Sequence, residues 1–151
     1  IGKAFRNEIT PKNFLYRTRE FEQWDIQYFC RPEDMDKYFK FWKGERMIWY
    51  QNLFNQKDSL RFRQHEANEL VFYAKKAFDI EYNSPWGWAE MEGIHWRADY
   101  DLGQHSKFSG EDLSYLDPVS HEKFLPHIVE ASGGVDRSFF FLLLDAYQEQ
   151  N

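Results

Sequence analysis

Residues 124–148 read FLPHIVEASGGVDRSFFFLLLDAYQ, and this stretch decides the fold class. Its first part, Phe124–Glu130, is typical of a strand. The small residues Ala131–Gly134 predict a tight turn, and the apolar run that follows predicts a helix over Val135–Gln148. A strand that leads directly into a helix indicates a mixed fold, in which helices pack on a sheet.

The rest of the chain also mixes strand and helix patterns. Aromatic residues between Tyr38 and Trp49 recur at helical spacing after a candidate N-cap, Asp34. We therefore predict one α+β domain over residues 1–151, an antiparallel β-sheet flanked by helices, with a helical insertion at about 33–77. The other predicted strands are Lys3–Ile9, Phe14–Phe29 and Phe78–Ile94 (interrupted at 84–87), and the other predicted helices are Glu66–Ala77 and Asp99–Lys107.

The composition excludes several classes of protein. Aromatic residues make up 20% of the 151 residues, too many for a disordered chain. The net charge of −6 gives no support for a general nucleic-acid-binding surface. Cys30 is the only cysteine, so an internal disulfide is impossible. The longest apolar run, Phe139–Leu144, is far too short to span a membrane, and an intracellular globular domain is expected.

A basic and aromatic cluster lies near the N-terminus, in residues 5–8 (FRNE) and 17–23 (RTREFEQ). Arginine offers phosphate oxygens a planar, permanently charged fork. Glu8 can accept a hydrogen bond from the exocyclic amine of a base, and Phe21 offers a flat surface for stacking. The alternative is an exposed hairpin with cross-strand ion pairs, and the residues by themselves favour this alternative.

Two further clusters are candidates for chemistry. In residues 130–137 (EASGGVDR) the glycines permit close backbone approach and the helix start favours an anion, although an ordinary strand-to-helix turn has the same pattern. Glu90 and Glu92 are expected to share one strand face, which suits an ammonium group or a divalent cation, or simply solvent. The five histidines show no zinc-ligand spacing, and no signature of covalent hydrolysis is present.

In their joint order, these clusters resemble the catalytic domain of class II aminoacyl-tRNA synthetases. Phe5–Glu8 followed by Arg17 and Phe21 is similar to motif 2, and Gly134–Arg137 at a helix start is similar to motif 3. The resemblance covers nearly the whole chain and is weakest at residues 31–58. Five longer segments of the sequence resemble glycyl-tRNA synthetase of the homodimeric type. They are FRNEITPKNFLYRTREFEQ (5–23), DIEY (79–82), EMEGIHWRADYDL (90–102), PHIVEASGGVDR (126–137) and LLLDAY (142–147).

The resemblance implies an ATP site with two catalytic arginines. Arg6 would bind the α-phosphate and Arg17 the outer phosphates, while Phe21 and Arg137 would hold the two faces of the adenine. Glu8 would accept a hydrogen bond from the adenine amine, and Arg137 would also help to hold the γ-phosphate. The catalytic residues would be Arg6 and Arg137. The full set of ATP-binding residues implied is Arg6, Asn7, Glu8, Arg17, Phe21, Glu90, Met91, Gly134 and Arg137, with Glu90 also a candidate Mg²⁺ ligand.

The resemblance also implies a glycine pocket. The ammonium group of glycine would face Asp25 and Glu130, and Arg97 and Ser132 would complete the pocket. The family usually has glutamate at the position of Asp25, so the carboxylate of this chain is one methylene shorter.

The implied activity is that of a cytoplasmic glycine–tRNA ligase, which uses ATP and Mg²⁺ to activate glycine and transfers it to tRNA(Gly). The resemblance predicts a homodimer for the full-length protein and no membrane association. It also predicts that this chain is an internal piece of the catalytic domain. The alternative is a non-catalytic synthetase-like paralogue that binds nucleotide or a protein partner. The joint presence of Arg6, Glu8, Arg17, Phe21 and Arg137 favours the enzyme.

Overall fold

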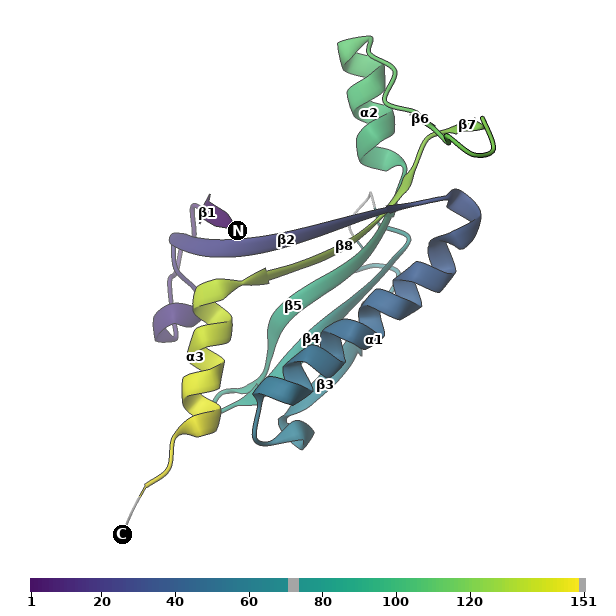
Figure 1. The fold of residues 1–151 in the computed structure, drawn as a ribbon. Helices are drawn as coiled ribbons and strands as arrows, with labels where there is room; N and C mark the ends of the chain where they lie inside the picture. Colours follow the sequence, from purple (N-terminus) through teal and green to yellow (C-terminus); the bar gives the residue numbers. More distant parts are fainter. Residues whose placement is uncertain (71–73, 150–151) are drawn as a thin grey trace.

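The computed structural model describes residues 1–70 and 74–149, which form a six-stranded antiparallel sheet with helices against it (Figure 1). The strand order is β1-β2-β8-β5-β4-β3. The predicted class, an antiparallel sheet flanked by helices, is confirmed. The strands are β1 (Gly2–Phe5), β2 (Glu20–Cys30), β3 (Leu60–Gln64), β4 (Lys76–Ser84), β5 (Gly87–Ala98) and β8 (His127–Gly134), and the helices are α1 (Met35–Leu53), α2 (Tyr100–Ser109) and α3 (Val135–Ala146).

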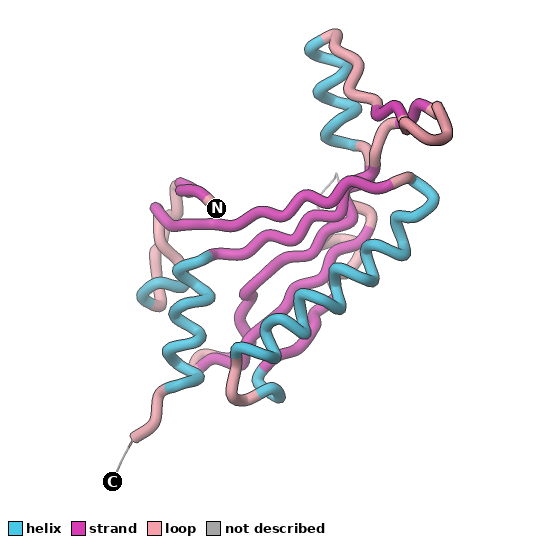
Figure 2. Tube along the Cα trace, viewed as in Figure 1, coloured by secondary structure: helices cyan, strands magenta, loops and turns pink. Residues whose placement is uncertain are grey.

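Helices α1 and α3 both cover the same face of the sheet (Figure 2). The core lies between them and the strands, and includes the fully buried side chains of Tyr50, Ile80, Ile94 and Phe141. Burying an apolar side chain of this size contributes roughly 1.5–3 kcal/mol. Among residues 1–70 and 74–149, no α-helix packs on the opposite face of the central strands, so polar side chains on this helix-free face can form a site.

The first helix is confirmed as α1, but its predicted aromatic face only in part, because Phe41 and Trp49 are exposed and the buried ring is that of Phe39. Phe39 of α1 packs against Phe78 and Trp96 of the sheet, with ring centroids 6.0 and 5.7 Å apart. Tyr38 and Trp42 pack in the same way against a single tyrosine, Tyr28 of β2. Asp34 occupies the N-cap position, but its side chain makes no capping hydrogen bond.

Between β5 and β8 the chain leaves the sheet and forms a small lobe, residues 99–126. The lobe contains α2 and a two-stranded sheet of β6 (Tyr115–Leu116) and β7 (Lys123–Phe124), and it projects beyond one end of the main sheet (Figure 1). The helix predicted for Asp99–Lys107 is confirmed as α2, and Gly110 ends it with φ of +78°.

The predicted strand Phe14–Phe29 is wrong in its first part. Residues Phe14–Tyr16 form a single 3-10 turn. Asn13, which precedes it, and Phe14, its first residue, have positive φ, and β2 begins only at Glu20. Strand β1 likewise ends at Phe5, so residues 6–19 are almost entirely loop. The loop folds over the helix-free face of the sheet and supplies part of the site described below.

The helix predicted for Glu66–Ala77 is also wrong. Residues 60–64 form β3, the chain turns at 66–69, and β4 begins at Lys76, while residues 71–73 lie outside the described residues. The helical insertion expected at about 33–77 is therefore α1 followed by an edge strand. Ala131–Gly134, expected as a turn, are instead the last residues of β8, which pairs with β2 and β5 along this stretch.

Candidate functional site

A cavity of about 320 Å³ opens on the helix-free face of the sheet. Its floor is formed by β2, β5 and β8, and its sides by the 6–18 loop and the start of α3. Of the residues that the resemblance assigns to ATP or glycine, all except Asn7 line it: Arg6, Glu8, Arg17, Phe21, Asp25, Glu90, Met91, Arg97, Glu130, Ser132, Gly134 and Arg137. Residues that are far apart in the sequence are thus brought to one place by the strand order.

Strand register places the acidic floor. Asp25 lies opposite Ser132 across the β2–β8 pair, and Gln27 lies opposite Glu130. The Gln27 amide bridges the two acids: its Nε2 donates to Glu130 Oε2 at 2.7 Å and to Asp25 Oδ1 at 3.1 Å. Arg97 donates to Glu130 Oε2 at 2.6 Å and makes a two-pronged ion pair with Asp101 at 2.7 Å. Both acids are therefore held in fixed positions.

The two acids have shifted pKa values of opposite direction. Loss of water raises the pKa of Asp25, and the nearby charge of Glu130 raises it further. Burial also acts to raise the pKa of Glu130, but the hydrogen bonds from His95 and Gln27 and the charge of Arg97 outweigh it, so this pKa lies below its ordinary value. The lowered pKa keeps Glu130 ionised, and this favours a cationic ligand beside it.

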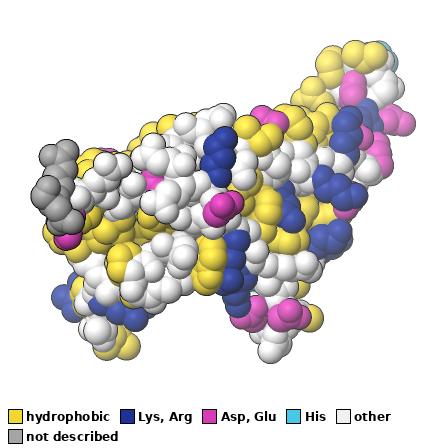
Figure 3. Space-filling view, turned by 90° about the horizontal axis from the view of Figure 1, so that it is seen from below, with side chains coloured by type: hydrophobic (Ala, Val, Ile, Leu, Met, Phe, Trp, Pro, Cys, Tyr) yellow, Lys and Arg dark blue, Asp and Glu magenta, His cyan; other side chains and the backbone are white. Residues whose placement is uncertain are grey.

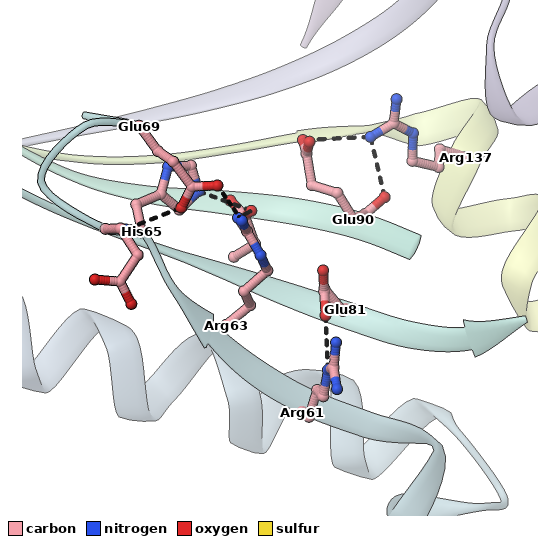
Figure 4. Close-up of polar contacts among 9 residues, drawn as sticks. Arg61, Arg63, His65, Glu69, Glu81, Glu90 and Arg137 are labelled. Atoms are coloured by element: carbon pink, nitrogen blue, oxygen red, sulfur yellow. Dashed lines mark hydrogen bonds and ion pairs between the residues drawn. The ribbon is translucent and has the colours of Figure 1, made fainter. Parts of the chain in front are cut away.

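Arg137 reaches from the first turn of α3 to the edge of the cavity (Figure 4). Its Nη1 donates to the backbone oxygen of Glu90 at 3.0 Å and approaches the Glu90 carboxylate at 3.3 Å. Its guanidinium also stacks on Tyr16, 4.4 Å from the ring centroid, and its Nε donates to the Tyr16 backbone oxygen at 3.2 Å. The 3-10 turn that the sequence did not predict thus positions Arg137.

Arg6 and Phe21 also line the cavity and lie together, with the Arg6 guanidinium carbon 5.4 Å from the centroid of the Phe21 ring. Glu8 lines the cavity next to them, and Arg19 Nε donates to the Glu8 backbone oxygen at 3.0 Å. The cross-strand ion pairs considered as an alternative occur at Lys3 and Glu20. Arg6 and Arg17 remain directed to the cavity, where they are available to an anionic ligand.

The expectation that Glu90 and Glu92 share one face is wrong. The β4–β5 register shifts between Ile80 and Glu81, which pair with Glu92 and Glu90, so one residue, Met91, is accommodated as a bulge. Glu90 therefore faces the cavity, whereas Glu92 points to the helix side, where it is fully buried and bonded to Arg46 and Tyr50. The side chain of Met91 is buried in the core, although the residue borders the cavity.

The polar surface continues from the cavity across β4 and β3 (Figure 4). Arg61 pairs with Glu81 at 2.7 Å, Arg63 pairs with Glu69, and His65 Nε2 lies 2.8 Å from Asp79 Oδ2. Burial raises the pKa of Asp79, and the charge of Glu90 adds to the shift.

Sequence reasoning gave no role to several other residues that line the cavity, among them Gln23, His95 and Asp136. Gln23 donates to Ser132 Oγ, and Asp136 Oδ2 accepts the backbone N–H of Glu22 at 2.7 Å, which ties α3 to β2. Strand alternation could have placed Gln23 and His95 on the cavity face. Gln23 shares its face with Asp25, and His95 shares its face with Arg97.

Within residues 1–70 and 74–149, no group of three or more His, Cys, Asp or Glu is arranged to hold a metal ion by itself. No helix in this part of the chain is both long enough and apolar enough to cross a membrane.

No family model matches the chain. The chain is similar to curated proteins named glycine–tRNA ligase. It is 51% identical to the one from Clostridium acetobutylicum and 49% identical to the one from Caldanaerobacter subterraneus subsp. tengcongensis, in each case over 150 residues. The one from Clostridium tetani is 50% identical over the same length. In each comparison the match covers 99% of this chain and 32% of the relative, so the chain spans about a third of the length of these proteins.

Proposed function

We propose that this chain is part of a glycine–tRNA ligase and forms the site in which ATP activates glycine. One observation carries the proposal: a single cavity is lined by three arginines (Arg6, Arg17, Arg137) and has a pair of acids (Asp25, Glu130) on its floor. Arginines suit the phosphates of a nucleotide, and paired acids suit the ammonium group of an amino acid. The similarity to glycine–tRNA ligases over 99% of the chain supports the choice of substrate.

In the proposed nucleotide site, Arg6 binds the α-phosphate and Arg17 the outer phosphates. Phe21 stacks on one face of the adenine and Arg137 covers the other, and Glu8 accepts a hydrogen bond from the adenine amine. Glu90, Met91 and Gly134 complete the set of proposed ATP contacts that line the cavity. Asn7, the remaining member of the set, does not line it. Arg137 sits against Tyr16 and Glu90 here, which supports a role as a guanidinium held ready at the cavity edge.

In the proposed glycine site, the ammonium group lies beside Asp25 and Glu130, and Arg97 and Ser132 border it. Glu130 has no freedom to turn away, because Gln27 and Arg97 both hold its Oε2. A polar wall of this kind rejects a larger amino acid, since an added methyl group would leave the acids without water and without a partner. Glycine is therefore selected because the pocket excludes amino acids that carry a side chain.

The residues of the cavity could hold Mg²⁺ only together with the phosphates of a bound nucleotide. Mg²⁺ keeps several waters and needs one or two protein carboxylates in addition to phosphate oxygens. The Glu90 carboxylate, at the cavity edge, is the ligand that we propose. Bound there, the ion would neutralise phosphate charge beside Arg137.

The chemistry is an in-line displacement. A carboxylate oxygen of glycine forms a bond to the α-phosphorus while the bond from that phosphorus to the bridging oxygen breaks, and the electron pair leaves with pyrophosphate. Arg6 and Arg137 counter the charge that builds up, so they are the catalytic residues of the proposal. No general base is required, because the attacking carboxylate is already ionised. The arginines and the acids therefore act by positioning and electrostatics.

For the full-length protein we propose tRNA(Gly) as the acceptor of the activated glycine, a homodimeric assembly and a cytoplasmic location. The second candidate, a non-catalytic paralogue, would retain the fold but not the complete set of nucleotide residues. The joint presence of Arg6, Glu8, Arg17, Phe21 and Arg137 around one cavity favours the enzyme.

Calorimetric titration with nucleotides tests this proposal. ATP with Mg²⁺ is expected to bind more tightly than GTP, because Glu8 accepts from the adenine amine but would face the O6 acceptor of guanine. Arg6→Ala is expected to weaken ATP binding by about 1.5–3 kcal/mol, while Lys40→Ala, on the exposed side of α1, leaves it unchanged. Equal binding of ATP and GTP would remove Glu8 from its role, and absence of ATP binding would contradict the proposal as a whole.

A further inference from the structure

Arg19, at the end of the loop before β2, contacts both ends of the short turn that carries Arg6 and Glu8. The backbone N–H of Arg6 donates to the backbone oxygen of Arg19 at 2.9 Å, directly after the last residue pair of β1 and β2. The Arg19 side chain reaches across the loop, and its Nε donates to the backbone oxygen of Glu8 at 3.0 Å. One residue therefore holds the start of the turn with its backbone and the end of the turn with its side chain.

The position of Glu8 depends on this side chain. Strand β1 ends at Phe5, so Glu8 has no partner in the sheet ladder. Its backbone N–H donates to the oxygen of Arg6 at 2.8 Å, which is a contact within the turn itself. Among the described residues, the hydrogen bond from Arg19 is the one that ties the Glu8 backbone to the rest of the loop. The Glu8 side chain, held at this point, lines the cavity.

We infer that Arg19 is a positioning residue for base selection: its side chain fixes Glu8, and the fixed carboxylate distinguishes adenine from guanine. This inference rests on the proposed function, since it places a purine base beside Glu8. A carboxylate accepts from the adenine amine and repels the O6 acceptor of guanine only while it is held at hydrogen-bonding distance. A turn without the Arg19 contact would let Glu8 move away from O6, so the penalty against guanine would fall.

The role requires a hydrogen-bond donor at the position of Nε, and the positive charge of Arg19 is not essential to it, because the acceptor is a neutral carbonyl. Two substitutions separate the donor from the charge. Glutamine carries Nε2 on Cδ, where arginine carries Nε, so Arg19→Gln keeps the donor and removes the charge. Arg19→Met keeps an unbranched side chain and removes both. Arg19 is exposed, so neither change disturbs the core.

Calorimetric titration of the full-length protein with ATP, GTP and inorganic triphosphate, each with Mg²⁺, tests the inference. The selectivity is the Kd for GTP divided by the Kd for ATP, and we expect Arg19→Met to lower it about fivefold or more. The affinity for inorganic triphosphate, which has no base, should stay unchanged. Arg19→Gln should keep the selectivity of the wild type. Lys12→Met is the matched control, because it removes one positive charge from the same loop while its hydrogen bonds with Arg17 are made by the backbone.

The outcomes separate the inference from the proposed function. If the wild type prefers ATP and Arg19→Met keeps that preference, the role of Arg19 is overturned and the proposed function stands. The same holds if Arg19→Met weakens the binding of ATP, GTP and inorganic triphosphate equally, because Arg19 would then act on the phosphates. Loss of selectivity in Arg19→Gln or in Lys12→Met would also overturn the inference, since the charge and not the donor would matter. A wild type that binds no ATP would overturn both.

Discussion

Glu92 shows what a single buried charge requires. Its side chain is fully buried beneath α1, and its carboxylate accepts from Arg46 at 2.7 and 2.8 Å and from the Tyr50 hydroxyl at 2.8 Å. Burial raises the pKa of Tyr50, and the charge of Glu92 adds to this, so the phenol stays protonated and remains a donor. The three side chains tie α1 to the centre of the sheet below the cavity.

Removing the arginine of this cluster should destabilise the protein strongly. Arg46→Leu would leave the Glu92 carboxylate buried with the Tyr50 hydroxyl as its one remaining partner from the cluster, at a cost of about 3–5 kcal/mol. Lys40→Ala, which breaks the exposed pair with Asp36 on the same helix, should cost at most about 1 kcal/mol. Chemical denaturation of both variants measures the difference, and equal losses would contradict the account.

Gly133 is a second residue whose position allows little change, because Trp24 leaves no room for a side chain there. A Cβ there would lie 2.5 Å from Cζ2 and 2.9 Å from Cε2 of Trp24, an indole packed against Trp49 of α1. We expect Gly133→Ala to lower the free energy of unfolding by about 1–3 kcal/mol, since the rigid ring must shift. Gly44→Ala in α1, where nothing lies within 4 Å of the added methyl group, should instead stabilise by about 0.5–1 kcal/mol. Equilibrium unfolding should therefore give opposite signs for the two variants.

At the scale of elements, Arg31 links the lobe of residues 99–126 to the end of β2. Arg31, which follows β2, donates to Asp117, Ser120 and Glu122, and its guanidinium lies 4.7 Å from the centroid of the Phe124 ring. The backbone N–H of Val119 and the side chain of Arg31 lower the pKa of Asp117 to about 2. Ionised Asp117 therefore helps to organise the β6–β7 turn.

A carbon-detected NMR titration of the Asp117 carboxyl checks this. The midpoint is expected at about 2 in the wild type. It should rise toward the ordinary value of 3.8 in Arg31→Ala, with the backbone hydrogen bonds retaining part of the shift. Because the folded pKa is the lower one, the contribution of Asp117 to the lobe is complete above 3.8 and is lost as the pH falls through 2. An unchanged midpoint in the variant would show that Arg31 does not act on Asp117.

The elements that the sequence predicted well are those with a strong apolar pattern, such as α1 and α3. The wrong predictions have physical reasons. β3 is an edge strand whose arginines pair with acids on its neighbours, so LRFRQ lacks a long apolar alternation. The Met91 bulge reverses the faces of Glu90 and Glu92, and such a shift depends on the partner strand. The residues of the site came from the resemblance, because Arg6, Glu8 and Arg17 in isolation also fit ordinary ion pairs.

At the scale of the whole molecule, the two faces of one sheet have different tasks. The helix side holds the core, and the opposite side collects charged side chains from strands that are adjacent in space but far apart in sequence. On the surface seen in Figure 3, hydrophobic side chains alternate with acidic and basic ones. The polar cavity, with cationic and acidic groups over a rigid antiparallel floor, is the feature on which the proposed function depends.

Pyrophosphate exchange in the full-length protein, with glycine, alanine and serine compared side by side, tests the central claim most directly. We expect strong exchange with glycine and hardly any with alanine or serine, because a side chain would displace water from Asp25 and Glu130 without replacing it. Glu130→Gln should reduce the glycine-dependent exchange while ATP binding stays nearly intact. Comparable exchange with alanine or serine, or no exchange with glycine, would contradict the account.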